Sequence, residues 1–356
     1  MKLVQKLPDV PLDIIGDIHG EIDALKKILS VLGYSPNGST TGNRKLVFVG
    51  DFCDRGPDSP GVIKLVENLV SSGNAFAILG NHEINLLADD PKDGSGWFFP
   101  ERFDSDQRFY APFEVATEKN KPRIVEFLNQ LPIVLERDDL RIVHAAWNST
   151  KVDQIRDLDV GNINGLHQTW EARTRASAIE TGLFQRYLDE REKWKGEIED
   201  PDNPPPFLDA IADYETLQHT YSPFKVLTSG VEARTKQAFF SGNRWRFSDR
   251  LPWWNDYDDR IPVVIGHYWR LFNPAPDQPQ SRYSQLFRDL ESTAWHGRHN
   301  NVFCIDYSVG ARWRNRKENR DPTSRFRLAA MRWPEMQLVF DDGQHIPTTN
   351  QPVLTD

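Results

Sequence analysis

Cysteine is scarce in this chain, and long apolar runs are missing from it. Only Cys53 and Cys304 occur among 356 residues, so neither a disulfide framework nor a four-thiolate zinc site can be built. A chain of this length can bury a core large enough to need neither. No apolar run approaches the roughly 18 residues of a membrane span, and residues 1–11 lack the unbroken apolar stretch of a secretory signal. These absences predict a cytoplasmic protein without a membrane partner.

Basic residues are outnumbered by acidic ones. The 43 Lys and Arg residues against 52 Asp and Glu residues give a formal net charge of −9. A negative overall field argues against binding duplex nucleic acid, but it leaves open an anionic small substrate held by a few local cations. Hydrophobic residues make up 38% of the chain, with 11 Trp and 20 Phe. That composition excludes a disordered chain.

The first third of the sequence alternates short apolar strands with amphipathic helices. In order, it predicts a strand at 13–16, a helix at 21–32, a strand at 45–49, a helix opened by Ser59 as N-cap and by Pro60 and closed by Gly73, a strand at 75–79, and a helix that starts at 82. Such alternation is typical of an α/β domain. We therefore predict an α/β fold.

The remaining two thirds are less regular. In order, they predict a loop at 89–121, a helix at 122–131, a hairpin of strands 132–136 and 140–144, a charged helix at about 177–195, core strands at 263–265 and 302–305, and a final hairpin of 325–332 with 336–340. We expect a single domain over 1–356, elaborated by an insertion or lid at 151–260 and ended by a loosely ordered tail at 341–356.

Two segments leave alternatives open. The Trp and Arg residues of 239–270 fit either an aromatic platform for a nucleobase or peptide, or a lid packed over the core. The basic run 312–317 fits either the attraction of an anionic substrate or a surface hairpin with exposed arginines.

Five short polar clusters follow predicted strands at the point where each strand ends. They contain Asp17 and His19; Asp51, Asp54 and Arg55; Asn81 and His82; His144; and His267, and glycine precedes four of the five. Strand ends of an α/β sheet meet at one edge, where ligands bind. A mixture of imidazole and hard oxygen donors suits Mn, Fe, Zn or Co better than calcium or magnesium. The sequence therefore predicts a transition-metal site.

Six donors are too many for one four-coordinate ion and enough for two, if one carboxylate bridges them. Asp51 is the expected bridge because it follows the middle strand of the first three. Two neighbouring metals can generate a hydroxide and clamp the oxygens of a displacement at phosphorus. Asp54 can then hold His82, a candidate general acid, in one tautomer. Arg55 can fork onto two phosphate oxygens.

The chain resembles the calcineurin-like metallophosphoesterases, in the branch that holds the Ser/Thr phosphoprotein phosphatases and the symmetrical diadenosine tetraphosphatases. The resemblance rests on five blocks in order: GDIHG at 16–20, GDFCDRG at 50–56, GNHE at 80–83, His144, and GH at 266–267. It implies a β-sandwich of two mixed sheets flanked by helices. It also implies one metal on Asp17, His19 and Asp51, a second on Asp51, Asn81, His144 and His267, His82 as the acid paired with Asp54, and Arg55 as a phosphate clamp.

The chain departs from that family pattern in places. Ala145-Ala146-Trp147 stands where the eukaryotic-type phosphatases have Gly-Gly, and Gly310 follows Asp306 later than in bacterial members. The second phosphate arginine has four candidates, Arg234, Arg246, Arg250 and Arg270, of which we favour Arg250. With Arg55 and Asn81 it would complete the predicted phosphate-binding set.

These observations predict a two-metal-dependent phosphoester hydrolase whose nucleophile is a hydroxide that bridges the metals. Manganese is the expected ion, with iron or zinc as alternatives. We expect a phosphomonoesterase of the Ser/Thr protein phosphatase type, acting on phosphoproteins. The alternative is a symmetrical hydrolase of dinucleoside polyphosphates such as diadenosine tetraphosphate. A second alternative is a non-catalytic scaffold, which should have lost some of the ligands.

Overall fold

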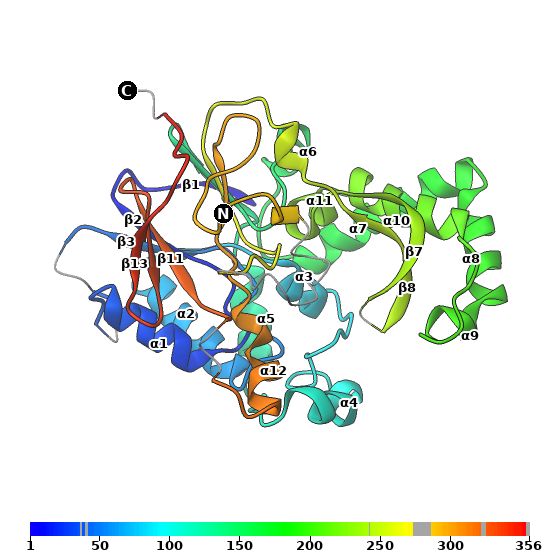
Figure 1. Ribbon diagram of the computed structural model, residues 1–356, viewed down its shortest axis with the longest axis horizontal. Coiled ribbons are helices and arrows are strands. Elements are labelled where there is room, and N and C mark those ends of the chain that lie inside the picture. Colours follow the sequence, from blue (N-terminus) through cyan, green and yellow to red (C-terminus); the bar gives the residue numbers. More distant parts are fainter. Residues whose placement is uncertain (36–37, 40–41, 242, 273–285, 322–324, 354–356) are drawn as a thin grey trace.

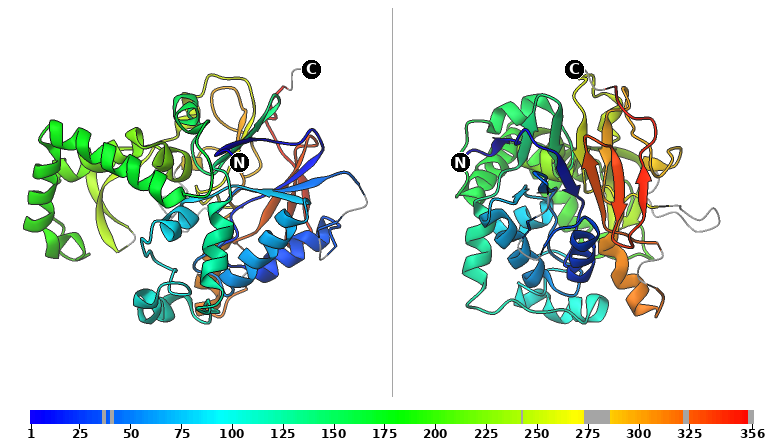
Figure 2. Two further views of the ribbon diagram at one scale, coloured as in Figure 1. Left: turned by 180° about the vertical axis from the view of Figure 1, so that it is seen from behind. Right: turned by 90° about the vertical axis from the view of Figure 1, so that its left-hand side faces the viewer.

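Two mixed β-sheets pack face to face in the computed structural model, and helices cover their outer sides (Figures 1 and 2). The structure describes residues 1–35, 38–39, 42–241, 243–272, 286–321 and 325–353. Buried side chains of both sheets meet between them, Ile14 and Val47 from one and Ile142 and Val264 from the other. This architecture confirms the predicted α/β class with two mixed, helix-flanked sheets.

The first sheet has the strand order β13-β12-β11-β2-β3-β4. Its strands are β2 (Leu12–Ile15), β3 (Lys45–Phe48), β4 (Ala75–Ala77), β11 (Ala329–Trp333), β12 (Gln337–Phe340) and β13 (His345–Pro347). β2, β3 and β4 are parallel, whereas β11 is antiparallel to β2 and β12, and β13 is antiparallel to β12. The carboxyl ends of β2, β3 and β4 therefore share one edge, as the sequence predicts.

The second sheet has the order β1-β5-β6-β9-β10. Its strands are β1 (Val4–Lys6), β5 (Val134–Arg137), β6 (Leu140–Val143), β9 (Val263–Ile265) and β10 (Val302–Cys304). β5 and β6 form the predicted antiparallel hairpin, and the other neighbours are parallel. The predicted strand 263–265 is confirmed at both of its ends.

Helices predicted from amphipathic patterns are confirmed with small shifts at their ends. They are α1 (Ile22–Val31), α2 (Ser59–Ser71), α3 (Asn81–Leu87) and α5 (Lys121–Asn129). One prediction at the start of α2 is wrong. Asp58, not Ser59, is the N-cap, because its Oδ1 accepts from the N–H of Gly61 at 2.7 Å while Ser59 is already helical. Ser59 Oγ instead accepts from the N–H of Asp54 at 2.9 Å.

Helix α4 (Pro100–Tyr110) lies within the segment predicted as a loop. It has no apolar stripe to detect, since its one fully buried side chain is Asp106. Asp106 holds the helix to the preceding loop by accepting from the N–H of Gly96 at 2.7 Å. Polar anchoring of this kind leaves no periodic signal in the sequence.

The insertion forms a helical arm that extends to one side of the sheets in Figure 1. The last part of its chain is a two-stranded hairpin, which lies nearer to the sheets than the tip of the arm. The elements of the insertion are α6 (Ser149–Ile155), α7 (Ile163–Glu180), α8 (Leu183–Lys193), α9 (Lys195–Ile198), α10 (Asp209–Tyr221), α11 (Pro223–Ser229), β7 (Glu232–Ser241) and β8 (Arg244–Arg250). The single charged helix predicted at 177–195 is wrong: Gly182, with φ at +68°, separates α7 from α8. The hairpin and α10 were not predicted.

The C-terminal part completes the first sheet and corrects two expectations. The 3-10 turns η1 (Trp253–Asn255) and η3 (Val309–Ala311) precede α12 (Arg312–Lys317), so the basic run is a helix and not a hairpin. The tail expected to be loose contains β13, held because Thr348 donates its N–H to the Met336 carbonyl at 3.0 Å. Among the described residues, no helix has the length and apolarity that crossing a membrane requires.

Candidate metal centre

The five predicted clusters meet where the strand ends of both sheets come together. The positions are Asp17 after β2, Asp51 after β3, Asn81 at the start of α3, His144 after β6 and His267 after β9. The N–H of His267 donates to Asp17 Oδ2 at 3.0 Å across 250 residues of chain. The N–H of Gly266 donates to the His144 carbonyl at 2.9 Å. The geometric prediction on which the site depends, that these segments converge, is thus met.

Three of these residues hold left-handed backbone conformations, with φ at +47° for His19, +50° for Asp51 and +71° for His267. Each such conformation costs about 1–3 kcal/mol in a non-glycine residue and persists only where the surrounding structure enforces it. Glycine permits the close approach beside Asp51, because a Cβ on Gly80 would lie 2.2 Å from Asp51 Oδ1. Strain of this kind is concentrated at functional sites.

Asp51 lies at the centre of the cluster. Its Oδ2 is 3.3 Å from Nε2 of His144, 3.7 Å from Nε2 of His19 and 3.9 Å from Nε2 of His82. Nδ1 of His144 donates to the Val49 carbonyl at 2.8 Å, so Nε2 is the ring nitrogen that faces the carboxylate. A ring nitrogen this close to a buried carboxylate oxygen requires a proton or a metal cation between the two atoms.

Two groups of side chains have the spacing of metal ligands, and they share Asp51. In the first, ligand atoms of His19, Asp51 and His82 lie within 4.8 Å of one another; in the second, those of Asp51, His144 and His267 do. Nδ1 of His267 is also 2.9 Å from Oδ1 of Asn81. The shared carboxylate is the one that the sequence predicts as the bridge.

Three buried polar atoms of the cluster have no hydrogen-bond partner in the part of the chain that the structure describes. They are Oδ1 of Asp17, Nε2 of His144 and Nε2 of His267. A buried polar atom left unpaired costs about 1–3 kcal/mol, and coordination to a divalent ion would satisfy all three. Nitrogen and oxygen donors in this mixture suit Mn, Fe or Zn. These residues therefore fit a two-metal centre such as the resemblance implies.

Charges within the cluster favour a cation beside Asp51. Burial opposes charge on Asp51, yet His144 and His82 hold the pKa of its carboxyl well below the usual range. Burial also opposes charge on His144, but Asp51 and Asp17 raise its pKa to about 10. Burial and the Asp306 carboxylate raise the pKa of Asp17 well above the usual range. The site accordingly concentrates buried negative charge that cations would neutralise.

His82 is held by a chain of hydrogen bonds. Its Nδ1 donates to Oδ2 of Asp54 at 2.5 Å, and Nε1 of Trp97 donates to the other carboxylate oxygen at 2.6 Å. Because both oxygens of Asp54 are engaged, the imidazole has one orientation, with Nε2 facing the cluster. The predicted pair of His82 and Asp54 is in place. Trp97 was not predicted as part of it.

Arg55 borders the cluster, with Nη1 3.1 Å from Nε2 of His19 and the guanidinium 4.9 Å from the ring centroid of Trp269. Arg250 donates from Nη1 to the His267 carbonyl at 3.2 Å, so it lies beside the second group of candidate ligands. Arg270 is buried and bonded to backbone carbonyls, and Arg234 pairs with carboxylates of the insertion. Of these candidates, Arg250 contacts a predicted ligand.

Buried carboxylates behind the site orient its backbone. Glu83 accepts from the N–H groups of Asp51, Phe52 and Gly80 at 2.8–2.9 Å and so fixes the loop that carries the bridge. Asp306 accepts from the N–H of Trp269 at 2.8 Å. From the sequence, Asp306 is compared with bacterial members only through the position of Gly310, and no role in the site is predicted for it. The strand pattern Val302–Asp306 was the signal that could have assigned it to the site.

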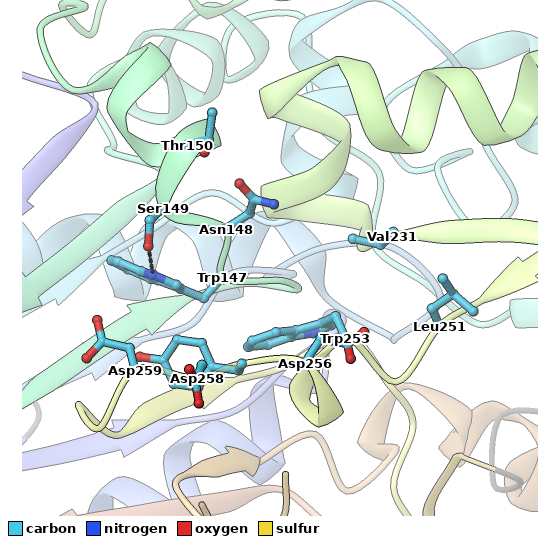
Figure 3. A pocket seen from close by; sticks show the side chains of 11 residues that line it. Trp147, Asn148, Ser149, Thr150, Val231, Leu251, Trp253, Asp256, Asp258 and Asp259 are labelled. Carbon is cyan, nitrogen blue, oxygen red and sulfur yellow. Dashed lines mark hydrogen bonds between the residues drawn. The ribbon is translucent and has the colours of Figure 1, made fainter. Parts of the chain in front are cut away.

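A cavity of about 500 Å³ lies beside Trp147, three residues after His144 in the chain (Figure 3). Trp147 and Trp253 line it together with Asp256, Asp258 and Asp259. Trp253 donates from Nε1 to the Ala145 carbonyl at 3.1 Å and is almost fully buried. Trp254 is buried as well and stacks on Phe287 at 5.5 Å. For these two indoles the structure favours the packed lid over the aromatic platform.

Most of the predicted ligands lie in a segment that matches a known family. Residues 10–175, a little under half of the chain, match the family model described as calcineurin-like phosphoesterase. That match contains Asp17, His19, Asp51, Asn81 and His144, whereas His267 lies beyond it.

Two similar proteins are named as tetraphosphatases. The asymmetrical bis(5'-nucleosyl)-tetraphosphatase PrpE of Oceanobacillus iheyensis is 51% identical over 74 residues, which are 20% of this chain and 30% of the relative. The symmetrical bis(5'-nucleosyl)-tetraphosphatase of Pectobacterium atrosepticum is 29% identical over 84% of this chain and 87% of the relative. This chain thus spans less than a third of the first relative and most of the second.

Among solved structures, the cold-active protein-tyrosine phosphatase of a Shewanella species is 16% identical, with a TM-score of 0.46 over 97% of this chain and 82% of that chain.

Proposed function

We propose that the protein is a two-metal-dependent phosphoester hydrolase. The observation that carries this proposal is the position of Asp51, whose Oδ2 is approached by the Nε2 atoms of three histidines in a buried pocket. Asp17, His19 and Asp51 would hold one ion, and Asp51, Asn81, His144 and His267 the other. Bound divalent ions would supply Lewis acidity to the phosphoryl oxygens and would activate water.

His82 would donate a proton to the departing oxygen. Its Nδ1–H is committed to Asp54, so Nε2 is the atom available to exchange a proton with substrate. Trp97 and Ser59 hold Asp54 through its side chain and its N–H respectively, and the pair is thereby kept in one geometry. A fixed acid within reach of the leaving group is worth about 10²–10⁴-fold in rate.

Arg55 would bind the phosphoryl oxygens from one side of the site, and Asn81 and Arg250 from the other. A planar guanidinium can engage two oxygens at once, which a lysine cannot do. Arg55 is kept near the cluster by its N–H, which donates to the Gly94 carbonyl at 3.2 Å, and by the indole of Trp269 beneath its guanidinium. These cations would neutralise charge that develops on the phosphoryl group.

As substrate we propose a dinucleoside polyphosphate such as diadenosine tetraphosphate, cleaved symmetrically. The symmetrical relatives of Coxiella burnetii and Pectobacterium atrosepticum align over 81% and 87% of their length, whereas the symmetrical relative of Ralstonia nicotianae and the two asymmetrical relatives align over 25–30% of theirs. The order of the two substrates predicted from the sequence is therefore reversed. A phosphomonoesterase of the Ser/Thr phosphatase type becomes the second candidate, since the five blocks alone do not separate the two.

A non-catalytic scaffold is disfavoured by the completeness of the donor set. His19, Asp51, His144 and His267 have the spacing of metal ligands, and Asp17 and Asn81 each contact His267. The acid pair and Arg55 lie beside them. Proteins that keep a fold for binding alone are under no constraint to retain all of these groups.

Parallel assays test the proposal. With added Mn²⁺, the purified protein is expected to convert diadenosine tetraphosphate to ADP alone, as resolved by anion-exchange chromatography. p-Nitrophenyl phosphate and a phosphoserine peptide are assayed beside it. ATP and AMP as products would overturn symmetrical cleavage, and peptide turnover without dinucleotide cleavage would restore the phosphoprotein substrate. Inactivity on every substrate with manganese, iron or zinc would support the scaffold.

A further inference from the structure

A second cavity, of about 550 Å³, lies between α4, α12 and the end of the β7–β8 hairpin. Its lining includes Arg102, Phe109 and Tyr110 from α4, Arg244 from β8, and Trp313 and Arg314 from α12. Volumes of a few hundred cubic ångströms are typical of small-molecule sites. The insertion therefore contributes to a cavity whose other walls belong to the core.

One wall of this cavity is aromatic. The rings of Tyr110 and Trp313 meet edge to face with centroids 5.0 Å apart, and Phe109 lies 6.4 Å from Tyr110. Phe109 is 46% exposed, which is unusual for a phenylalanine that serves only the core. Trp313 is half-buried. Indole and phenyl faces of this kind are the surfaces on which nucleobases stack.

Three of the other seven residues that line the cavity are arginines. They lie there with two carboxylates, Asp93 and Glu199, so the lining is net positive. Asp93 pairs with Arg102, and Arg244 donates to Glu215 at 3.2 Å. The guanidinium of Arg314 is 5.3 Å from the ring centroid of Trp313. Arginines beside an aromatic face suit a ligand that joins a base to phosphate groups.

The cavity adjoins the phosphate-binding side of the metal centre. The N–H of Arg55 donates to the carbonyl of Gly94, whose neighbour Asp93 lines the cavity. Gly94 packs directly on Arg55, since a Cβ on Gly94 would lie 2.7 Å from Cγ of Arg55. Residues 93 and 94 thus connect the wall of the cavity to the residue proposed to clamp phosphate.

The cavity in Figure 3 is acidic, unlike the cavity beside α12. It is lined by Asp256, Asp258 and Asp259, and the nearby Arg141 is already paired with Asp259 at 2.6 Å. A polyphosphate would meet carboxylates there. Charge complementarity therefore favours the cavity beside α12.

We propose that the cavity between α4, α12 and the β7–β8 hairpin binds one nucleotide half of a dinucleoside polyphosphate. The base stacks on Trp313, and Arg314 and Arg244 contact the phosphates that lead to Arg55. This inference rests on the function proposed above and assigns a role to the end of the insertion. The arrangement also accounts for the basic run 312–317, of which Arg314 faces the cavity.

Binding of ADP to the full-length protein tests the cavity without any turnover. Calorimetric titration is done in EDTA, so that nucleotide binding is measured apart from metal coordination. Trp313→Ala is expected to weaken ADP binding roughly tenfold, the size of one base-stacking contact. Trp313→Phe, which keeps an aromatic face, is expected to recover most of it. Arg320→Ala, an exposed arginine paired with Glu318 outside the cavity, is the matched control and is expected to bind as the parent does.

Kinetics give the second readout. Trp313→Ala and Arg314→Ala are expected to raise KM for diadenosine tetraphosphate several-fold, so that kcat/KM for this substrate falls relative to that for p-nitrophenyl phosphate. The loss from Arg314→Ala should shrink at high salt, because a phosphate contact is screened. Loss of both activities in proportion would mean that the variants damage the fold.

These measurements test the cavity assignment and the proposed reaction independently of each other. Equal ADP affinity in the parent and in Trp313→Ala would overturn the cavity assignment. It would also be overturned if a phosphoserine peptide inhibited cleavage of diadenosine tetraphosphate more strongly than ADP does. Dinucleotide cleavage with unchanged KM in all variants would overturn the cavity while leaving the proposed function intact. Binding of ADP that depends on Trp313, without cleavage of the dinucleotide, would overturn the function and leave a nucleotide site.

Discussion

At the scale of single residues, substitution of Asp51 is expected to have the largest effect on metal binding and turnover. Asp51→Asn removes the one carboxylate shared by both groups of candidate ligands, so we expect loss of both ions and a fall in turnover of at least about 10³-fold. Metal content by mass spectrometry and phosphate release together check this. Asp58→Asn is the control, because Asn also caps helices. Retention of two ions by Asp51→Asn would contradict the bridging role.

Substitution of His82 is expected to affect proton donation to the leaving group and not metal binding. His82→Asn is expected to keep the ions and to lose about 10²–10⁴-fold in turnover of phenyl phosphate, whose leaving group needs a proton. The loss for p-nitrophenyl phosphate should be much smaller. His345→Asn, an exposed histidine in β13, serves as the control. An equal loss on both esters would mean that His82 is not the acid.

Residues of the site could be predicted from the sequence where a motif marks them. Asp17, Asp51, Asn81 and His267 each follow a glycine at a strand end, which is a local and readable signal. Trp97 was missed because it reaches Asp54 from a loop with no periodic pattern, across 43 residues. Contacts of that kind depend on the fold of a loop, and no spacing in the sequence encodes them.

At the scale of the elements, the start of α2 is set by one side chain. Asp58→Ala removes the acceptor for the N–H of Gly61 and is expected to lower the free energy of unfolding by about 0.5–2 kcal/mol. Urea unfolding followed by circular dichroism measures it. Asp58→Asn should restore most of the loss. If Asp58→Ala were as stable as the parent while Ser59→Ala was not, the cap would be Ser59 after all.

The sequence predicts an element well when burial imposes a period on it. β9 and α1 have apolar patterns that follow their buried faces, and their predicted ends are right to within one residue. α7 buries only four of its 18 residues, and β7 has no fully buried residue, so neither has a clear period. The insertion was therefore the part of the fold that sequence reasoning could not resolve.

At the scale of the whole molecule, two sheets converge on one buried cluster, so metal binding should couple to global stability. Ions that bind the folded chain alone stabilise it by about 2.7 kcal/mol per site at a concentration 100 times the dissociation constant. For a chain of this size, we expect EDTA to lower the melting temperature on the order of 5–10 °C, and Mn²⁺ to restore it. Differential scanning calorimetry measures the shift.

The variant Asp51→Asn decides whether that shift arises at the proposed centre. Since Asp51 joins the strand ends of β2 and β3 to those of β6 and β9, its loss should remove the response to EDTA and to added Mn²⁺. Arg320→Ala should retain the full response, because Arg320 is exposed and its side chain pairs with Glu318 and not with a residue of the cluster. A full EDTA response in Asp51→Asn would place the stabilising ions elsewhere in the molecule. The two sheets would then be held together by packing alone, and the link between fold and reaction would be lost.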